Sequence, residues 1–201
     1  MRILVIGATG TIGRAVVAAL QGGHDLVLAS HAKAPEKVDI ADPASLRALY
    51  ERVGRVDAIV CAAGGAAWKP IAELTDADFA FSLANKLMGQ VNVIRHGFAR
   101  VADGGSITIT SGYLAMHPMP SSGAVSLVNA GLEGFTRAAA LEAPRGIRVN
   151  AVSPPWVSET LVAMGQDPAH GLPASDVARS YVESVTGGQT GAVIAPSRSS
   201  R

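Results

Sequence analysis

Hydrophobic residues fall into short continuous runs that alternate with longer helical patterns along the whole chain. Residues 3–6 form a continuous apolar run, which is typical of a strand covered on both faces. A glycine-rich turn and then a helical pattern follow, and this order of strand and helix recurs. The other expected strands are 25–30, 38–40, 56–62, 106–110, 147–152 and 190–195, and the expected helices are 14–20, 43–53, 76–100, 126–143 and 176–185.

This alternation predicts one doubly wound α/β domain of the Rossmann type, with a mostly parallel seven-stranded sheet between two layers of helices. Local signals mark two helix starts. Asp42 precedes Pro43 as an N-cap, and Thr75 with Asp78 forms a variant of the capping box. No internal repeat or linker marks a second domain. We therefore expect the domain to cover residues 1–195 and residues 196–201 to form a flexible polar tail.

The composition argues against several classes of protein. Of the 201 residues, 48% are hydrophobic and 16% are charged, which is not the composition of a disordered chain. Seventeen Lys and Arg residues against sixteen Asp and Glu leave a net charge of +1, so we expect no binding to nucleic acid or to an anionic membrane. The single cysteine, Cys61, excludes an internal disulfide and a multi-cysteine zinc site.

The chain also lacks the pattern of a membrane or export segment. No uninterrupted apolar stretch approaches the length of a membrane span. Residues 3–13 are uncharged, but their glycines and threonines, and Arg14 after them, argue against a signal peptide. We therefore expect a cytoplasmic protein that acts on a small molecule.

Gly7, Gly10 and Gly13 lie between the first expected strand and the first expected helix. Glycine at such positions permits a tight turn, close approach of the backbone to a diphosphate, and close packing of the helix against the strand. The helix start adds unpaired N–H groups and a partial positive charge. The turn therefore indicates a dinucleotide-binding site, although a purely structural turn uses the same residues.

The residues at the end of the second strand favour NADP(H) over NAD(H). An NAD site commonly has Asp or Glu there, to bind the ribose hydroxyls. Here Ser30, His31 and Lys33 follow one another closely, with no acidic residue before Glu36. A hydroxyl, an imidazole and an ammonium group can each donate a hydrogen bond to a 2′-phosphate, and Arg14 could add a guanidinium. The alternative is a solvent-exposed loop that is basic without binding anything.

Several segments together resemble the short-chain dehydrogenase/reductase family over nearly the whole chain. Each segment is common by itself, but their order and spacing are specific. The segments are the turn 7–13, Val38-Asp39-Ile40, Ala62-Ala63-Gly64, 107–111, Leu132-Glu133-Gly134-Phe135-Thr136, 147–154 and Gln189-Thr190-Gly191. The glycine pattern GxxGxxG is similar to that of the family's extended and atypical branches.

This resemblance implies contacts to the cofactor. The implied residues are Thr9, Gly10, Thr11 and Ile12 at the diphosphate, Asp39 and Ile40 at the adenine, Ala62, Ala63 and Gly64 at the inner ribose, and Pro154, Val157 and Thr160 at the nicotinamide. Where the family has Pro-Gly, this chain has Pro154-Pro155, and the second proline fixes φ and removes an N–H group.

The residues that transfer the proton in this family are mostly absent. The family uses a Tyr-x-x-x-Lys pair on the helix after the fifth strand, and Val125 and Asn129 occupy those positions here. The family's serine corresponds to Ser111, which we expect to hydrogen-bond the developing alkoxide. The family's asparagine on the fourth helix falls at Lys86, or at Asn85 if the alignment shifts by one residue.

Lys86 is the candidate proton donor with the best placement. A lysine that points into a cleft beside Ser111 can have its pKa lowered by desolvation, although the side chain could instead extend outward to solvent. Tyr113 fits a pocket-wall or interface aromatic residue better than an acid, and His117 fits a solvent-facing loop residue. We expect Cys61 to be buried and inert.

Two functions therefore stay open. One is an NADP(H)-dependent oxidoreductase that acts on a small carbonyl or alcohol through a non-standard proton donor. The other is an NADP(H)-binding sensor or regulatory partner without turnover. We favour the enzyme, because Ser111 and the nicotinamide-side segment occur together. Small residues such as Ala130, Gly131 and Gly134 on more than one face of the long helices lead us to expect a homo-oligomer, either a dimer or a tetramer.

Overall fold

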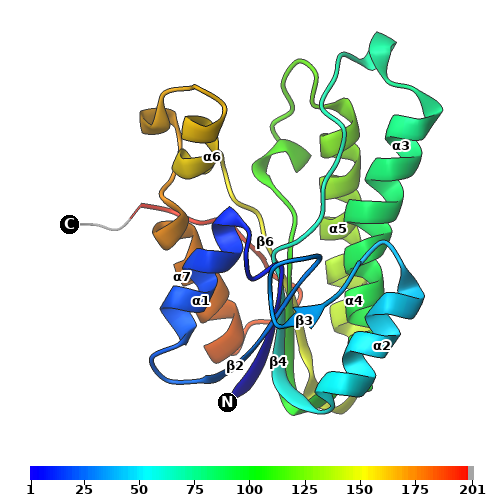
Figure 1. The fold of residues 1–201 in the computed structure, drawn as a ribbon, viewed down its shortest axis with the longest axis vertical. Coiled ribbons are helices and arrows are strands. Elements are labelled where there is room, and N and C mark those ends of the chain that lie inside the picture. The colour runs from blue at the N-terminus through cyan, green and yellow to red at the C-terminus, as the bar shows by residue number, and fades with distance from the viewer. Residues whose placement is uncertain (199–201) are drawn as a thin grey trace.

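Seven parallel strands form one sheet in the computed structural model, which describes residues 1–198 (Figure 1). The strands are β1 (Arg2–Ile6), β2 (Asp25–Ser30), β3 (Glu36–Lys37), β4 (Val56–Cys61), β5 (Val101–Thr110), β6 (Arg148–Val152) and β7 (Val193–Ile194). Their order across the sheet is β3-β2-β1-β4-β5-β6-β7. The chain therefore winds outward in both directions from β1 and β4, and the predicted doubly wound α/β fold is confirmed.

Helices cover both faces of this sheet (Figure 1). On one face α1 (Thr11–Leu20) packs beside α7 (Ala174–Thr186), and the other face carries α2 (Pro43–Val53), α4 (Gly89–Gly97) and α5 (Gly123–Glu142). In β1, Ile3 and Val5 pack in the core beside α1 and α7, whereas Leu4 and Ile6 pack in the other core, and all four are fully buried. The continuous apolar run of residues 3–6 is thus a strand covered on both faces.

The two helix starts expected from the sequence are present. The Asp42 side chain accepts a hydrogen bond from the Ala44 N–H, and Gly54 ends α2 with φ of 70°. At the start of α3 (Asp76–Ser82), Thr75 and Asp78 make both hydrogen bonds of a capping box. These short polar signals predict helix boundaries well, because they satisfy N–H groups that the helix itself leaves unpaired.

The long helix expected over 76–100 is present without a break from Asp76 to Gly97, but its middle is not α-helical. A π-helical stretch, Leu83–Met88, joins α3 to α4. A π-helical turn bonds residue i to i+5 and so takes up one extra residue, which shifts the side chains that follow. The apolar pattern continues through the insertion, so hydrophobic periodicity does not reveal it.

Other boundaries differ from those expected. The third strand is Glu36–Lys37 and not 38–40. The Val38 N–H makes a last hydrogen bond to the Ser30 carbonyl at 3.1 Å, and the side chains of Val38 and Ile40 are buried in the core. The fifth strand begins at Val101, before the expected 106, and the last strand is only Val193–Ile194. A short helix after β6, α6 (Ser158–Ala163), was not expected.

The expected C-terminal tail is described as far as Arg198. The Arg198 guanidinium donates hydrogen bonds to the carbonyls of Ala169 (3.1 Å) and Gly171 (2.7 Å). Residues 199–201 of the expected tail lie outside the described residues.

Candidate active site

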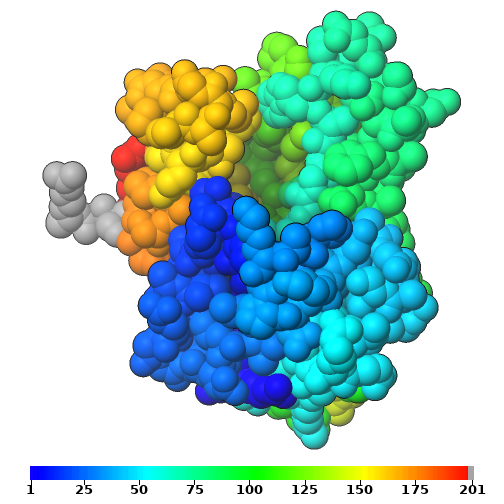
Figure 2. All heavy atoms as spheres, viewed as in Figure 1, coloured from blue at the N-terminus to red at the C-terminus, as the bar shows by residue number. Residues whose placement is uncertain are grey.

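A cavity of about 410 Å³ lies beyond the carboxyl ends of the central strands. Figure 2 shows the surface hollowed there, between the segment that carries α6 and the segments that lead into α3 and α5. We call this the reaction cavity. It is lined by Ile12, Gly64, Ala66, Trp68, Lys86, Thr110, Ser111, Gly112, Tyr113, Leu114, Val125, Asn129, Pro154, Pro155, Trp156, Val157 and Thr160. Ligands of doubly wound sheets bind at this edge, because loops from several strands converge there.

A second cavity of about 180 Å³ adjoins the first and shares Gly64 with it. We call this the adenosine cavity. Its lining includes Gly7, Ser30, His31, Asp39, Ile40, Ala63 and Asn85. Residues expected at the adenine and at the nicotinamide therefore line two neighbouring cavities, as an extended dinucleotide requires. Thr9, Gly10, Thr11, Gly13, Lys33 and Ala62 line neither cavity.

The glycine turn between β1 and α1 leaves no room for a side chain at Gly7 or Gly13. Gly7 has φ of +85°, and a Cβ there would lie 2.6 Å from the Ala62 carbonyl oxygen. A Cβ on Gly13 would lie 1.9 Å from the Gly7 carbonyl oxygen. The N-cap of α1 is Gly10, which provides no side-chain cap, so the first N–H groups of α1 are left for a ligand. These features fit the diphosphate of a dinucleotide.

The loop after β2 is built around Ser30. The Ser30 Oγ accepts hydrogen bonds from the N–H groups of Lys33 (3.0 Å) and Ala34 (2.8 Å), so this hydroxyl holds the loop in place. His31 and Lys33 are exposed, and the Lys37 ammonium, which was not singled out in the sequence, donates to the Ala32 carbonyl at 2.6 Å. Three basic side chains therefore lie close together in the chain after β2, namely His31 and Lys33 in the loop and Lys37 in β3.

Asp39 is the one carboxylate that lines the adenosine cavity, and it is already engaged. Its Oδ1 accepts a hydrogen bond from the Ala41 N–H at 2.9 Å. Asp39 follows β3 rather than β2, so it stands apart from the position at the end of β2 where an NAD site carries its acid.

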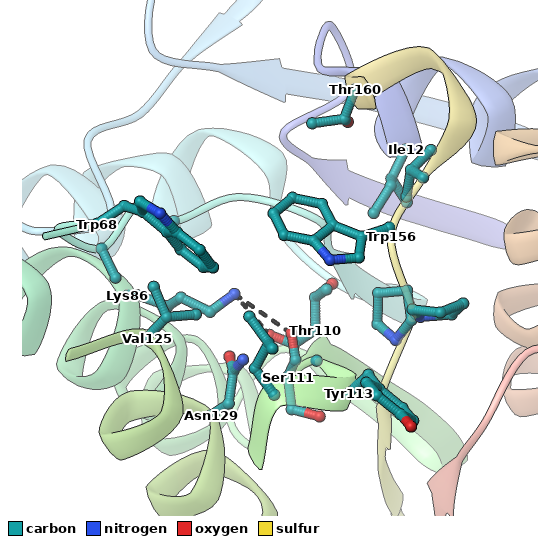
Figure 3. Close-up of a pocket in the computed structure, with 17 residues that line it drawn as sticks. Ile12, Trp68, Lys86, Thr110, Ser111, Tyr113, Val125, Asn129, Trp156 and Thr160 are labelled. Atoms are coloured by element: carbon teal, nitrogen blue, oxygen red, sulfur yellow. Dashed lines mark hydrogen bonds between the residues drawn. The ribbon is translucent and has the colours of Figure 1, made fainter. Parts of the chain in front are cut away.

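The π-helical stretch gives Asn85 and Lys86 separate positions. The Asn85 Oδ1 accepts a hydrogen bond from the Gly65 N–H at 2.7 Å and fixes the loop after β4. Lys86 enters the reaction cavity, where its Nζ lies 3.4 Å from each of the carbonyl oxygens of Thr110 and Ser111 (Figure 3). The sequence left open whether Asn85 or Lys86 corresponds to the family's asparagine. Both residues line a cavity: Asn85 lines the adenosine cavity and Lys86 the reaction cavity.

Among residues 1–198, Lys86 is the only charged residue that lines the reaction cavity. Burial of its ammonium group lowers the pKa of Lys86 from 10.5 to about 8. The group therefore stays largely protonated at neutral pH but releases its proton far more easily than a surface lysine. The side chain does not extend outward to solvent, which was the alternative that the sequence left open.

Ser111 follows β5 and is buried, and its hydroxyl faces a carboxylate that the sequence reasoning did not single out. The Ser111 Oγ donates to the Glu133 Oε1 at 3.0 Å, and the Ser153 Oγ donates to the same oxygen at 3.1 Å. The other Glu133 oxygen lies 3.8 Å from the Arg137 guanidinium. Glu133 is four residues after Asn129 on α5, and this spacing places both on one helix face, which was the available signal.

The positions of the missing Tyr-x-x-x-Lys pair also line the reaction cavity. Val125 contributes an apolar wall, and the Oδ1 of the buried Asn129 has no hydrogen-bond partner among residues 1–198. Tyr113 lines the cavity and stacks on His117 with ring centroids 4.1 Å apart, whereas His117 itself is exposed and lines neither cavity. Among these candidates, Lys86 is the one with a hydrogen bond to Ser111, since its Nζ lies 3.4 Å from the Ser111 carbonyl oxygen.

Cys61 is fully buried in β4, and burial raises the pKa of its thiol to about 11. The thiol is therefore protonated and inert at neutral pH, as expected. Within residues 1–198 no group of three or more His, Cys, Asp or Glu side chains is arranged to hold a metal ion. None of the helices described is long and apolar enough to cross a bilayer.

Both tryptophans of the chain lie in the reaction cavity, and sequence reasoning missed them. Trp68 belongs to the loop after β4 and Trp156 to the loop after β6. Their rings meet edge to face, with centroids 5.5 Å apart and an interplanar angle of 65°. No spacing rule links residues so far apart in the chain.

Comparison with known proteins gives one family match and several related proteins. A family model described as enoyl-(acyl carrier protein) reductase matches residues 9–195. The cis-4-hydroxycyclohexanecarboxylate dehydrogenase of Sinomonas cyclohexanicum is 32% identical over 176 residues, which cover 84% of this chain and 68% of that protein. An uncharacterized NAD-dependent oxidoreductase of Mycobacterium tuberculosis is 31% identical over 134 residues, 63% of this chain and 49% of its own length. The chain spans about half the length of several of the curated relatives that it matches.

Solved structures are similar over nearly the whole chain. A crystal structure of a Listeria innocua protein has a TM-score of 0.93 at 37% identity and covers 97% of this chain and 98% of its own. The structure of a small-chain dehydrogenase in complex with NADPH has a TM-score of 0.86 at 27% identity, covering 97% of this chain and 95% of its own.

Proposed function

Because the chain belongs to the short-chain dehydrogenase/reductase family of nicotinamide-dependent oxidoreductases, we propose that it interconverts a small carbonyl compound and its alcohol, using NADP(H). One observation carries the proposal. Lys86, Ser111 and the nicotinamide-side residues Pro154 and Val157 line one cavity, although they come from three segments of the chain. A proton donor and a hydride donor must reach the same carbonyl, so this convergence is what a reductase needs.

The residues proposed to hold the cofactor would contact each of its parts. Gly7, Gly10 and Gly13, with Thr9, Thr11 and Ile12, would hold the diphosphate at the start of α1. Asp39 and Ile40 would lie at the adenine, and Ala62, Ala63 and Gly64 at the inner ribose. Pro154 and Val157 would flank the nicotinamide, near Thr160. A bound nicotinamide would supply the hydride.

NADP(H) is proposed as the cofactor because β2 ends without a carboxylate. Ser30 orders the loop, and His31 and Lys33 are exposed beside it. An anionic 2′-phosphate is attracted by the cations of this loop, whereas an acid at the end of β2 would repel it. A structural neighbour binds NADPH, while a relative is named as NAD-dependent, so the names of related proteins do not decide between the two cofactors.

Lys86 is proposed as the proton donor. In the reductive direction its ammonium gives a proton to the carbonyl oxygen as the carbon accepts the hydride, and the amine left behind is tolerated because burial disfavours the charged form. Ser111 would hydrogen-bond the reacting oxygen beside Lys86, and for this its hydroxyl must turn away from the Glu133 Oε1, which accepts its one hydrogen in this structure. No tyrosine is needed for this step.

We propose that copies of the chain associate through the α3–α5 side. Large apolar side chains are exposed there, including Phe81 (51%), Leu127 (49%) and Leu141 (89%). Exposed apolar residues gathered on one side of a molecule commonly mark an interface.

The test is binding and turnover with the whole chain. Calorimetric titration should give a dissociation constant for NADPH at least tenfold below that for NADH, and the protein should oxidise NADPH with some member of a broad carbonyl panel. Tight NADPH binding without turnover of any carbonyl would indicate a non-catalytic NADP(H)-binding protein instead. Equal binding of both dinucleotides would contradict the cofactor assignment.

A further inference from the structure

Most of the side chains that line the reaction cavity are apolar or aromatic, among them Trp68, Leu114, Val125 and Trp156. Tyr113 adds a further ring with a hydroxyl group. The Lys86 ammonium lies among them, beside the backbone carbonyls of Thr110 and Ser111. A ligand therefore meets a polar point, suited to an oxygen atom, within a wall that is otherwise largely apolar.

The two indole rings come from opposite sides of the cavity and meet (Figure 3). Trp68 follows β4, Trp156 follows β6, and their rings form an edge-to-face pair with centroids 5.5 Å apart. Trp68 remains 39% exposed and Trp156 half-buried, so neither is a core residue. Large aromatic side chains held at the mouth of a polar-ended cavity have surface available for a ligand.

Hydrogen bonds and an ion pair hold the two chain segments that carry the indoles. Beside Trp68, the Ala67 N–H donates to the Ser82 Oγ at 2.9 Å, and the Lys69 ammonium pairs with Asp78 at 2.9 Å. The Trp156 carbonyl accepts a hydrogen bond from the Leu172 N–H at 2.8 Å. An aromatic wall fixed in this way binds a flat or rigid group with little loss of its own freedom.

We propose that Trp68 and Trp156 form a binding site for the ring of a cyclic, apolar carbonyl compound, with its oxygen at Lys86 and Ser111. The proposal rests on the proposed oxidoreductase function and adds the class of substrate to it. The cavity volume of about 410 Å³ must also admit the nicotinamide end of the cofactor, so the site takes a compound of about one ring rather than a fused system.

A ring is favoured over an open chain for two reasons. Ring faces and edges pack against indoles in offset or edge-to-face geometry, which adds to the stabilisation from buried area. A ring also has few internal rotations to lose, whereas an open chain of equal carbon number loses several on binding. An aliphatic chain also buries area against the indoles, but it loses internal rotations when it binds.

The chain's own tryptophans provide the assay, because it has only two and both line the site. Protein made with 5-fluorotryptophan gives two fluorine resonances, which Trp68→Phe and Trp156→Phe assign. With the oxidised cofactor present, cyclohexanone should shift both resonances with saturation. The acyclic 2-hexanone should bind at least about fivefold more weakly, the factor expected from one aromatic contact.

Variants separate the ring contact from general packing. Trp68→Leu should weaken cyclohexanone binding at least about fivefold and leave 2-hexanone within twofold, whereas Trp68→Phe keeps an aromatic ring and most of the affinity. Met164→Leu is the control, since Met164 is exposed, lines neither cavity and lies outside the proposed interface. Calorimetry with NADPH should give the same dissociation constant for all three variants.

The outcomes distinguish this inference from the proposed function. Equal affinity for the two ketones, or no shift of either resonance while NADPH binds, would overturn the ring site and leave the oxidoreductase function standing. Saturable binding of cyclohexanone to a protein that does not bind NADPH would support the ring site and reject the proposed function. If Trp68→Leu weakened the binding of both ketones equally, Trp68 would contribute only buried area and not a contact specific to a ring, and the ring site would be refuted.

Discussion

Replacing Lys86 with methionine should stabilise the protein at neutral pH. The Lys86 side chain is half-buried without a carboxylate partner, and desolvation lowers its pKa from 10.5 to about 8. At about 1.4 kcal/mol per pH unit, holding this charge in the folded state costs at most about 3 kcal/mol. Methionine fills a similar volume and carries no charge, so the free energy of unfolding should rise by up to about 3 kcal/mol.

The sign of this effect depends on pH in a way that identifies Lys86. Below pH 8 the side chain is protonated in both the folded and the unfolded state, and the whole cost is present. Between about 8 and 10.5 the folded state releases the proton while the unfolded state keeps it, so the stability of the wild type rises with pH. The advantage of Lys86→Met should therefore shrink through this window and disappear near pH 10.5.

Urea denaturation of the two proteins at neutral pH and near pH 10.5 measures this difference. Lys33→Met is the control, because Lys33 is exposed and its replacement should change stability by less than about 0.5 kcal/mol at either pH. A Lys86→Met protein that is less stable than the wild type at neutral pH, or equally stabilised at both pH values, would refute the assignment of a desolvated charge.

The same substitution should remove activity. Loss of the proton donor lowers the reductase rate by about 10²–10⁴-fold, while the affinity for NADPH stays within about twofold. The wild-type rate should fall as pH rises through about 8, because Lys86 then loses the proton that it must donate. Full activity in Lys86→Met would assign the proton to Tyr113, His117 or solvent.

The other predictions concern the choice of cofactor, the missing Tyr-x-x-x-Lys pair, the Glu133 carboxylate and the association of copies of the chain. His31→Ala and Lys33→Ala should each raise the dissociation constant for NADPH by about 3–10-fold and leave that for NADH unchanged by calorimetry, and equal effects on both would contradict a 2′-phosphate site. The double variant Val125→Tyr/Asn129→Lys should raise the reductase rate, and more so when Lys86→Asn is added. No gain in either variant would show that the cavity lacks more than this pair. Glu133→Leu should lower the free energy of unfolding by about 2–4 kcal/mol, because two serine hydroxyls lose their acceptor, while Glu133→Gln should cost less than half as much; equal losses in denaturation would contradict this role. Light scattering at micromolar concentration should give a mass of at least twice 20.5 kDa, and a monomer would reject association through the α3–α5 side.

The glycine turn that we propose for the cofactor could be predicted because its signals are local. Gly7 is required by its φ of +85° and Gly13 by its close approach to the Gly7 carbonyl, and the end of β2 follows directly from the strand pattern. Capping residues such as Asp42 and Thr75 likewise act over a few positions. Sequence reasoning succeeds where the physical cause and the residue lie within one turn of the chain.

The reacting half could be predicted only in part. Trp68 and Trp156 are 5.5 Å apart in space but stand alone in two loops, so nothing in either loop points to the other. Glu133 was visible only as one residue in a family-like segment, and its partner Ser153 comes from another segment, directly after β6. The extra residue in Leu83–Met88 left two alignments open, because apolar periodicity continues across a π-helical turn.

A lysine at position 86 and the family's Tyr-x-x-x-Lys pair at positions 125 and 129 would interfere with each other in the same cavity, for a physical reason. Asn129 occupies the lysine position of the pair and lines the same cavity as Lys86, so a lysine there would put two ammonium groups into one apolar space. Two like charges in a site of low polarity repel, and one of them would lose its proton. A neutral amide at 129 keeps Lys86 charged and able to donate, and Val125 leaves open the space that a tyrosine would fill. The departures at 125 and 129 are therefore consistent with an acid that has moved from α5 to the π-helical stretch, and Lys86→Asn should be needed before the family pair can work at full effect.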